Sequence, residues 1–340
     1  MPMPRTKDAP PSNREEGDLK AARRVLRFAG EALSALSDTL DGAFSRALDL
    51  LAAAQGRVVV SGMGKSGHIA RKLAATLSST GTPAQFVHPA EASHGDLGAL
   101  TRSDALIMLS NSGETAELSD LITYAKRFHI PMIGIASNPD SALIAAADAP
   151  LVLPRVQEAC PMGLAPTTST TLMLALGDAL AVALMERKGF SADQYRDFHP
   201  AGALGRALIR VSDLMHGQGE FPLVGADTPM TQILIDMTSY GRFGFAGVVG
   251  VKDEAGRLIG IFTDGDLRRH IHGNPLDHVV GDLMTKAPKT IACGKLAAEA
   301  LAEMNALRIT SLFVVVDDAV GASEPVGLIH IHDCLRAGLR

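Results

Sequence analysis

Apolar residues recur at three- and four-residue intervals between residues 25 and 51, and this period predicts two amphipathic helices. From Arg57 onward, short apolar and β-branched runs alternate with helical segments. Such alternation predicts an α/β domain, a parallel sheet flanked by helices, because parallel strands need crossover helices. The expected strands are residues 57–61, 84–87, 104–109, 131–136 and 150–153, and the expected helices between them are residues 65–80, 114–128 and 141–146.

The most apolar segment lies inside a further expected helix, residues 164–188. Its apolar part, Leu172 to Met185, spans only 14 residues and contains Asp178. A membrane span needs about 20 apolar residues, so we expect a buried helix and no membrane partner. Residues 1–18 are rich in proline and mixed charge without periodicity, and we expect a disordered tail there, with no signal peptide.

The second half of the chain repeats itself. Residues 211–215 (VSDLM) and 280–284 (VGDLM) each precede a helix, two strands and a terminal helix, with the first helices at 229–239 and 295–307. The terminal helices open at Thr263 and His330. A repeat of this length predicts two α+β modules, residues 211–273 and 280–340, joined by a linker at 201–210 to an α/β domain at 19–200.

Composition narrows the functional classes. The net charge of -5 provides no basic field, so nucleic acid is not an expected partner. The three cysteines show no paired metal-ligand spacing, which is typical of a reducing compartment and favours a cytoplasmic location without disulfides.

A glycine turn joins the first expected strand to the first crossover helix. Gly62, Gly64 and Gly67 flank Lys65 and Ser66, and a helix that starts there offers unpaired amides to a phosphate. The spacing matches a dinucleotide fingerprint, but His88 stands where the acidic ribose ligand is expected. A nucleotide P-loop would need glycine at Val59. Two interpretations of the turn remain: it binds a smaller phosphorylated ligand, or its glycines only permit close packing of the strand on the helix.

A second loop of this kind follows the strand at 104–109. Its hydroxyls, Ser110, Ser112 and Thr115, can donate to phosphate oxygens. An ordinary helix N-cap is the alternative, but it needs only one of them.

Five motifs stand in order along the first half of the chain: SGMGKSGH at 61–68, HPAEASHGDLG at 88–98, SNSGET at 110–115, EACPMGLAPT at 158–167 and HPAGALG at 199–205. Together they resemble the arabinose-5-phosphate isomerases, a family of sugar isomerase (SIS) domains, from about residue 20 to 210. One departure is Ala201, where the family usually has glycine. If this position needs a positive φ, alanine would strain a turn next to His199. The 211–340 repeat is similar to a tandem pair of cystathionine-beta-synthase (CBS) domains.

The resemblance implies interconversion of D-ribulose 5-phosphate and D-arabinose 5-phosphate through an enediol or enediolate, for 3-deoxy-D-manno-octulosonate (Kdo) and lipopolysaccharide or capsule synthesis. It implies four catalytic candidates, Lys65, Glu117, Glu158 and His199. We assign Glu158 as the base and expect desolvation to raise its affinity for protons. His199 would be the acid and base partner, in the site of a neighbouring subunit, and Lys65 would stabilise the oxyanion. Glu117 has a simpler alternative, an acidic residue favoured by the helix dipole.

His94 with Asp96 would line the sugar pocket or hold a metal. Only two ligands occur locally and enediol chemistry needs no metal, so we expect no required cofactor and leave an inhibitory divalent metal at His94 as the alternative. We expect a homotetramer by resemblance.

In CBS domains, an aspartate often contacts a ribose and a Ser or Thr three residues earlier contacts phosphate. Thr263 and Asp266 keep this pattern for a nucleotide or nucleotide-sugar, whereas His330 breaks it before Asp333. A purely structural role for the pair is the alternative. For the whole chain, the alternatives are an isomerase of another sugar phosphate and a non-catalytic sugar-phosphate sensor.

Overall fold

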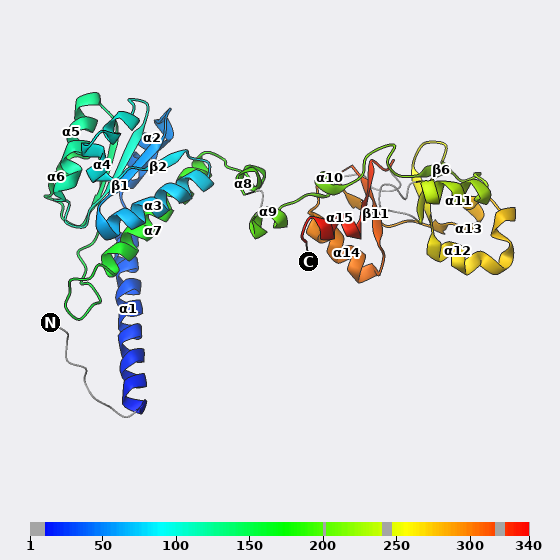
Figure 1. Ribbon diagram of the computed structural model, residues 1–340, viewed down its shortest axis with the longest axis horizontal. Helices are drawn as coiled ribbons and strands as arrows, with labels where there is room; N and C mark the ends of the chain where they lie inside the picture. Colours follow the sequence, from blue (N-terminus) through cyan, green and yellow to red (C-terminus); the bar gives the residue numbers. More distant parts are fainter. Residues whose placement is uncertain (1–10, 200–201, 240–246, 317–323, 340) are drawn as a thin grey trace. The chain divides into compact units, whose positions relative to one another are not determined.

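The computed structural model describes residues 11–199, 202–239, 247–316 and 324–339, and the chain divides into two compact units, Met1–Tyr195 and Arg196–Arg340 (Figure 1). The division falls before the linker predicted at 201–210, which contains the short helix α9 (Ala203–Ala207). It falls within α8 (Ala192–Phe198).

The N-terminal unit confirms the predicted alternation of strands and helices. It opens with two helices, and the first is longer than predicted because α1 begins at Pro11. Residues 11–18 of the predicted tail are therefore helical, since proline suits a first helical turn and Glu15, Glu16 and Lys20 favour helix without any apolar period. The rest of the predicted tail lies outside the described residues. The elements are α1 (Pro11–Thr39), α2 (Gly42–Ala53), β1 (Val58–Gly62), α3 (Gly64–Ser79), β2 (Ala84–Phe86), α4 (Pro89–Ser93), η1 (Asp96–Ala99), β3 (Ala105–Leu109), η2 (Ala116–Leu118), α5 (Ser119–Phe128), β4 (Met132–Ala136), α6 (Ala142–Ala146), β5 (Ala149–Val152) and α7 (Thr168–Arg187).

All five strands of this unit are parallel and lie in the order β2-β1-β3-β4-β5. The chain moves outward from β1 to β2 and then crosses back to β3 on the other side of β1. The point where the direction of winding reverses is where open α/β sheets bind ligands, beyond the carboxyl ends of the strands. That point lies between the ends of β1 and β3.

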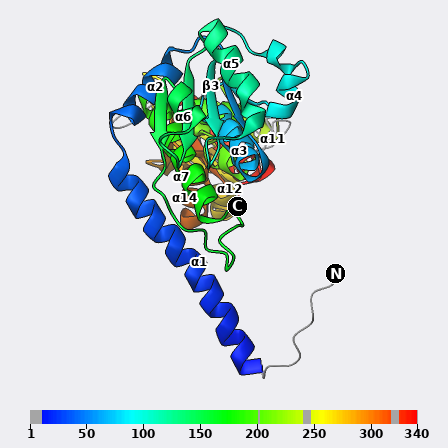
Figure 2. The same cartoon turned by 90° about the vertical axis from the view of Figure 1, so that its left-hand side faces the viewer.

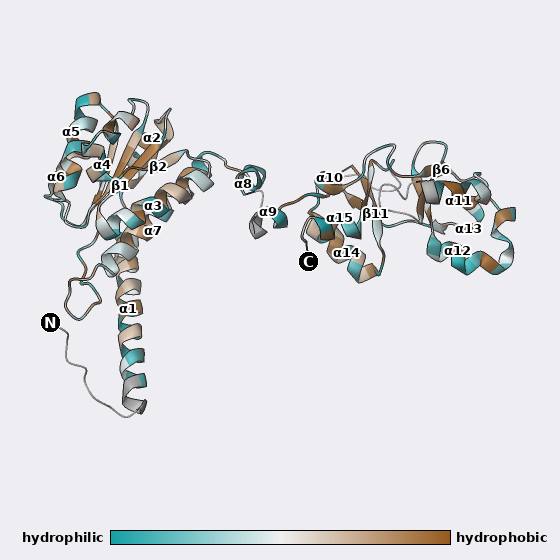
Figure 3. Ribbon diagram, viewed as in Figure 1, coloured by the Kyte–Doolittle hydropathy of each residue, from teal (hydrophilic) through white to brown (hydrophobic). Residues whose placement is uncertain are grey.

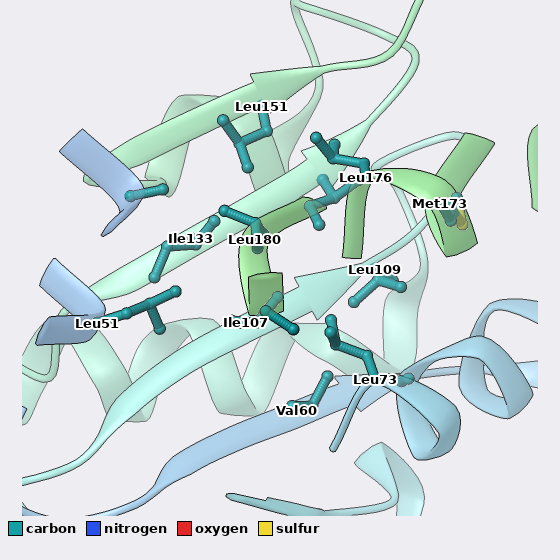
Figure 4. Close-up of a cluster of buried hydrophobic side chains, with 14 of the residues drawn as sticks. Leu51, Val60, Leu73, Ile107, Leu109, Ile133, Leu151, Met173, Leu176 and Leu180 are labelled. Atoms are coloured by element: carbon teal, nitrogen blue, oxygen red, sulfur yellow. The ribbon is translucent and has the colours of Figure 1, made fainter. Parts of the chain in front are cut away.

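Helices cover both faces of the sheet. One face packs on α1, α2, α3 and α7, with Leu73, Ile107 and Leu180 in its fully buried core (Figure 4). The other face packs against α4, α5 and α6. The strands are hydrophobic along their length, as a parallel sheet covered on both faces requires (Figure 3).

Helix α7 is the one described helix whose length and composition would suit a membrane span. Half of its apolar window is buried within the unit, and Leu172, Leu176 and Leu180 belong to the core of the sheet. It is therefore a core helix, as predicted. The first turns of α1, by contrast, extend away from the sheet, and Leu26 is 72% exposed (Figure 2).

The C-terminal unit confirms the predicted repeat. Its two sheets have the strand orders β6-β7-β8-β9 and β10-β11-β12. Each repeat begins on the sheet of the other one, because Thr285 pairs with Ile261 of β8 and His216 pairs with Leu328 of β12. The elements are α10 (Val211–Leu214), β6 (Leu223–Gly225), α11 (Met230–Ser239), β7 (Val248–Lys252), β8 (Leu258–Thr263), α12 (Asp264–His270), α13 (Val280–Leu283), β9 (Thr285–Lys286), β10 (Thr290–Ala292), α14 (Ala297–Leu307), β11 (Ser311–Val315), β12 (Gly327–His330) and α15 (Ile331–Arg336).

Candidate active site

The junction of β1 and α3 contains three glycines, Gly62, Gly64 and Gly67, that the fold needs for different reasons. Gly64 has φ +56°, the left-handed region that favours glycine. A Cβ at Gly67 would lie 2.5 Å from the carbonyl oxygen of Gly62, so Gly67 serves close packing of α3 on β1. Helix α3 has no side-chain N-cap, and its first intrahelical bond runs from the Gly67 amide to the Met63 carbonyl. The preceding amides and the exposed Lys65 therefore lie where a phosphate would bind.

The loop after β3 is organised by its hydroxyls. Buried Ser110 shares a hydrogen bond of 2.7 Å with Thr115 and accepts one of 3.0 Å from the Gly113 amide. Ser112 accepts from the Glu114 amide at 3.2 Å. Thr115 makes no capping hydrogen bond to the helix that follows, so the N-cap alternative does not account for this hydroxyl.

The helix predicted at 114–128 starts later than expected. A 3-10 turn, η2, comes first, and α5 begins only at Ser119. Positive φ at Gly113 (+72°) and the intra-loop bonds of Ser110 hold residues 110–115 in a loop rather than a helix. Glu117 lies in η2 and is exposed, near the start of the helical segment, where the dipole interpretation also places it.

The two loops lie side by side. Gly62 and Leu109, the last residues of β1 and β3, are direct partners in the parallel pairing of these strands. A Cβ at Gly62 would come within 3.0 Å of the Leu109 carbonyl oxygen. The structure therefore brings together the predicted substrate-binding residues of both loops: Gly62, Gly64, Ser66, Ser110, Ser112 and Thr115.

Glu158 is brought to the same end of the sheet by the pairing of α3 with α7. Lys72 forms an ion pair with Asp178, and Lys188 donates to Thr82 at 2.9 Å. Both contacts join residues 106 positions apart, so the two helices run parallel. The start of α3, with Lys65, and the start of α7, with Glu158 bound to it, consequently face the same way, toward the carboxyl ends of the strands.

The Glu158 carboxylate binds the N-terminus of α7. It accepts hydrogen bonds from the amides of Thr167 and Thr168, both at 2.7 Å, and from the hydroxyls of Thr167 and Ser169. Burial raises the pKa of Glu158, but these hydrogen bonds outweigh it and place the pKa below its ordinary value. The expectation that desolvation would raise its proton affinity is therefore wrong, because neighbours nine to eleven residues later stabilise the charged form.

Sequence reasoning missed one residue near this site. His88 lies two residues after β2, at the start of α4, and among the described residues its buried Nδ1 atom has no hydrogen-bond partner. It lines a cavity of about 390 Å³ together with Arg71 and Asp96, and the Arg71 guanidinium lies 4.0 Å from the Phe86 ring centre. Its position is the signal that the sequence offers, since His88 comes just after the strand next to β1, where ligands bind in parallel sheets.

His94 ends α4 and is exposed. Among the residues that the structure describes, no group of three or more histidine, cysteine or acidic side chains is arranged to hold a metal ion.

In the C-terminal unit, a cavity of about 650 Å³ contains the predicted Thr263 and Asp266. Asp266 is buried and accepts bonds from the Thr263 amide and hydroxyl, from Thr285 and from Arg269. Burial raises its pKa, but these bonds lower it overall. All its acceptor positions are used, so in this conformation it braces the cavity wall and has none left for a ribose.

The corresponding aspartate of the second repeat has different partners. Asp333 accepts from the His330 amide at 3.1 Å and contacts His216 Nε2 at 3.2 Å. Thr285 and His216 are equivalent positions of the repeat, so a hydroxyl meets the first aspartate and an imidazole meets the second.

Comparison with known proteins agrees with this arrangement. The SIS domain family matches residues 50–183, and the CBS domain family matches residues 211–273 and 280–340. The arabinose 5-phosphate isomerase KdsD of Pseudomonas aeruginosa is 48% identical over 324 residues, which are 94% of this chain and 97% of that protein. The chain belongs to the arabinose 5-phosphate isomerase family. KdsD of Yersinia pestis is 45% identical over 94% of this chain and 96% of its own length.

A solved structure supports the fold of the N-terminal unit. This Escherichia coli protein, in complex with arabinose 5-phosphate, is 38% identical with a TM-score of 0.52. The match covers 56% of this chain and 100% of that one.

One catalytic candidate implied by the isomerase family belongs to a different unit from the other three. His199 belongs to the C-terminal unit and follows α8, whereas Lys65, Glu117 and Glu158 belong to the N-terminal unit. Its action in a neighbouring subunit stays a prediction. Ala201, where the family usually has glycine, lies outside the described residues.

Proposed function

We propose that the chain interconverts D-ribulose 5-phosphate and D-arabinose 5-phosphate through an enediol or enediolate, at the loops that follow β1 and β3. The observation that carries this proposal is the pairing of Gly62 with Leu109, which sets two phosphate-type loops side by side at the point where winding reverses. Family membership over nearly the whole chain supports the substrate. The arabinose 5-phosphate product supplies Kdo synthesis for lipopolysaccharide or capsule.

The phosphate is bound by the first amides of α3 and the hydroxyls of the β3 loop. The partial positive charge at the start of this 16-residue helix favours an anion. Ser66, Ser112 and Thr115 are the hydroxyl donors closest in the chain to these two helix starts. His94 contributes to the sugar pocket.

Proton transfer between C1 and C2 is assigned to Glu158 as base. A carboxylate with a lowered pKa is a weak base, so the reaction depends on stabilising the enediolate, and Lys65 supplies that charge. His199 of a neighbouring subunit moves the proton between the two oxygens, because a histidine can both give and take a proton near neutral pH. Glu117 is the fourth catalytic candidate, a second carboxylate in the same unit as Glu158.

The test is incubation of the purified full chain with ribulose 5-phosphate in deuterium oxide, followed by proton NMR. The expected result is arabinose 5-phosphate with deuterium at the exchanged carbon. The absence of both arabinose 5-phosphate and deuterium exchange would refute the isomerase proposal. Glu158→Gln should abolish turnover and keep sugar-phosphate binding; residual turnover with lost binding would contradict the base role alone.

A nucleotide or nucleotide-sugar in the C-terminal cavity is a second proposal. Four cationic side chains, Arg268, Arg269, Lys289 and Arg308, line it, against two acidic ones, Asp264 and Asp266. Since Arg269 already pairs with Asp266, the remaining cations favour a polyphosphate chain. Calorimetric titration of the full chain with ATP should show binding that weakens with salt; absence of heat with ATP and with a nucleotide-sugar would leave the pair a structural role.

The isomerase proposal includes three further expectations, on the cofactor, the assembly and the location of the enzyme. The enzyme needs no cofactor, because a base and an electrostatic stabiliser suffice for enediol chemistry, so dialysis against a chelator should not lower turnover. If a divalent metal at His94 inhibits, the chelator raises turnover instead. We propose a homotetramer in the cytoplasm, supported by exposed apolar residues of α1 such as Leu26, and analytical ultracentrifugation measures the assembly.

A further inference from the structure

The two carboxylate oxygens of Glu158 have unequal surroundings. Oε2 accepts three hydrogen bonds, from the amides of Thr167 and Thr168 and from the Thr167 hydroxyl at 3.0 Å. Oε1 accepts one, from the Ser169 hydroxyl. An ionised carboxylate oxygen offers about two lone-pair positions, so Oε2 is fully used and Oε1 keeps one position open. Only Oε1 can take a proton without first breaking a hydrogen bond.

We infer that Ser169 is a positioning residue for the isomerisation: its hydroxyl holds Oε1 of Glu158 at the angle from which this oxygen takes the sugar proton and returns it. The inference rests on the base role proposed above. Ser169 itself is 2% exposed, so its hydroxyl is enclosed by protein. It acts through Glu158.

The rigidity of Ser169 comes from its place in the fold. It lies in the first turn of α7, a 20-residue helix whose Leu172, Leu176 and Leu180 are buried against the sheet. The Thr167 hydroxyl also accepts from the Ala159 amide at 3.1 Å, which ties the segment after Glu158 to the same turn. A carboxylate anchored on Oε2 by three donors and steered on Oε1 by one has a single orientation.

Loss of the Ser169 hydroxyl has two separable consequences. Oε1 becomes free to turn, and a proton-transfer group out of place by about 1 Å costs on the order of 100-fold in rate. The charged carboxylate also loses a donor, so the protonated form becomes easier to reach and the acid limb of the pH profile moves to higher pH. Ionisable groups around this segment include Arg24 of α1, which donates to the Ala159 carbonyl at 3.3 Å, Glu31 of α1, which lines a cavity with Gln157 and Thr168, and Cys160 in the following loop. Lys65 lies at the same end of the sheet. None of these groups is changed by the substitution.

The experiment compares Ser169→Ala, Ser169→Thr and Thr170→Val in the full chain. Thr170 is the matched control, because its hydroxyl lies in the same helical turn but donates to the Thr167 carbonyl at 2.9 Å. For Ser169→Ala we expect kcat to fall about 10- to 100-fold, KM for arabinose 5-phosphate to change little, and the acid limb of kcat to move upward. Ser169→Thr keeps the hydroxyl and restores most of the rate. Thr170→Val behaves as wild type.

Wild-type kcat and an unmoved acid limb in Ser169→Ala would overturn the inference, as would an equal loss in Thr170→Val. If Ser169→Ala lowers the melting temperature too far for assay, Ser169→Cys decides, because it keeps the volume and weakens the donor; it must show the same upward shift. Turnover retained in Glu158→Gln would instead refute the base role itself, which separates the two failures.

Discussion

Gly67→Ala tests whether the β1–α3 junction is the sugar-phosphate site. The added Cβ would lie 2.5 Å from the Gly62 carbonyl oxygen and 3.2 Å from its carbonyl carbon. Both atoms belong to the backbone, so α3 must move away from β1 by several tenths of an ångström. Forcing a methyl group into a packed contact costs about 1–3 kcal/mol, and the helix gains about 0.5–1 kcal/mol from replacing glycine. The midpoints of these two ranges leave a net cost of about 1 kcal/mol.

The measurable effects are a lower melting temperature and a weaker substrate complex. For a unit of this size, about 1 kcal/mol corresponds to roughly 2–4 °C, so the N-terminal unit should melt lower by roughly that amount. Because the same movement shifts the amides of Gly64 and Ser66, KM for arabinose 5-phosphate should rise about tenfold or more. Calorimetric scanning and steady-state kinetics on the full chain measure the two quantities.

The matched control is Gly30→Ala. Gly30 lies in α1, is exposed, and a Cβ built there meets no atom within 4 Å. The same substitution should therefore stabilise the unit by about 0.5–1 kcal/mol and leave KM unchanged. A Gly67→Ala variant that melts at or above the wild-type temperature would refute the packing argument. One that melts lower with unchanged KM would show that the phosphate binds elsewhere.

The charges and thiols of the two units lead to three other predictions. Because the folded-state pKa of Glu158 is lowered, its charge stabilises the fold above the ordinary value of 4.5 and loses that effect as the pH falls through the lowered value. The melting-temperature advantage of wild type over Glu158→Gln should thus be full near neutral pH and shrink below pH 4.5; an advantage that grows in acid contradicts the sign. Amide hydrogen bonds, first that of Ala165, lower the pKa of Cys160, whereas burial raises the pKa of Cys334 to about 11. Iodoacetamide should therefore label Cys160 first and Cys334 only on unfolding, and peptide mass spectrometry measures the order of labelling. Early labelling of Cys334 would contradict the burial of its thiol in the folded protein. Lys289→Ala should weaken ATP binding and reduce its salt dependence with turnover unchanged, and an unaltered titration would place the nucleotide outside the cavity.

Local sequence determined most of the architecture. The β-branched run at 58–60 fixes a buried strand, the Gly64 position fixes a left-handed turn, and the alternation after Arg57 fixes a parallel sheet. The repeat at 211–215 and 280–284 likewise defines the two C-terminal modules. These features depend on the period of apolar side chains and on the backbone freedom of glycine, and both can be read from a short stretch of sequence. The start of α1 cannot be predicted from periodicity, because polar helix formers leave no apolar period.

Tertiary structure decided the chemistry of the site. The sequence suggested a desolvated Glu158, but only the fold shows that two amides and two hydroxyls at the start of α7 outweigh burial. The parallel packing of α3 on α7 brings Lys65 and Glu158 to one end of the sheet, although 93 positions separate them in the chain. The sequence alone could name these residues and not their environment, because a pKa depends on the balance of burial and donors in space.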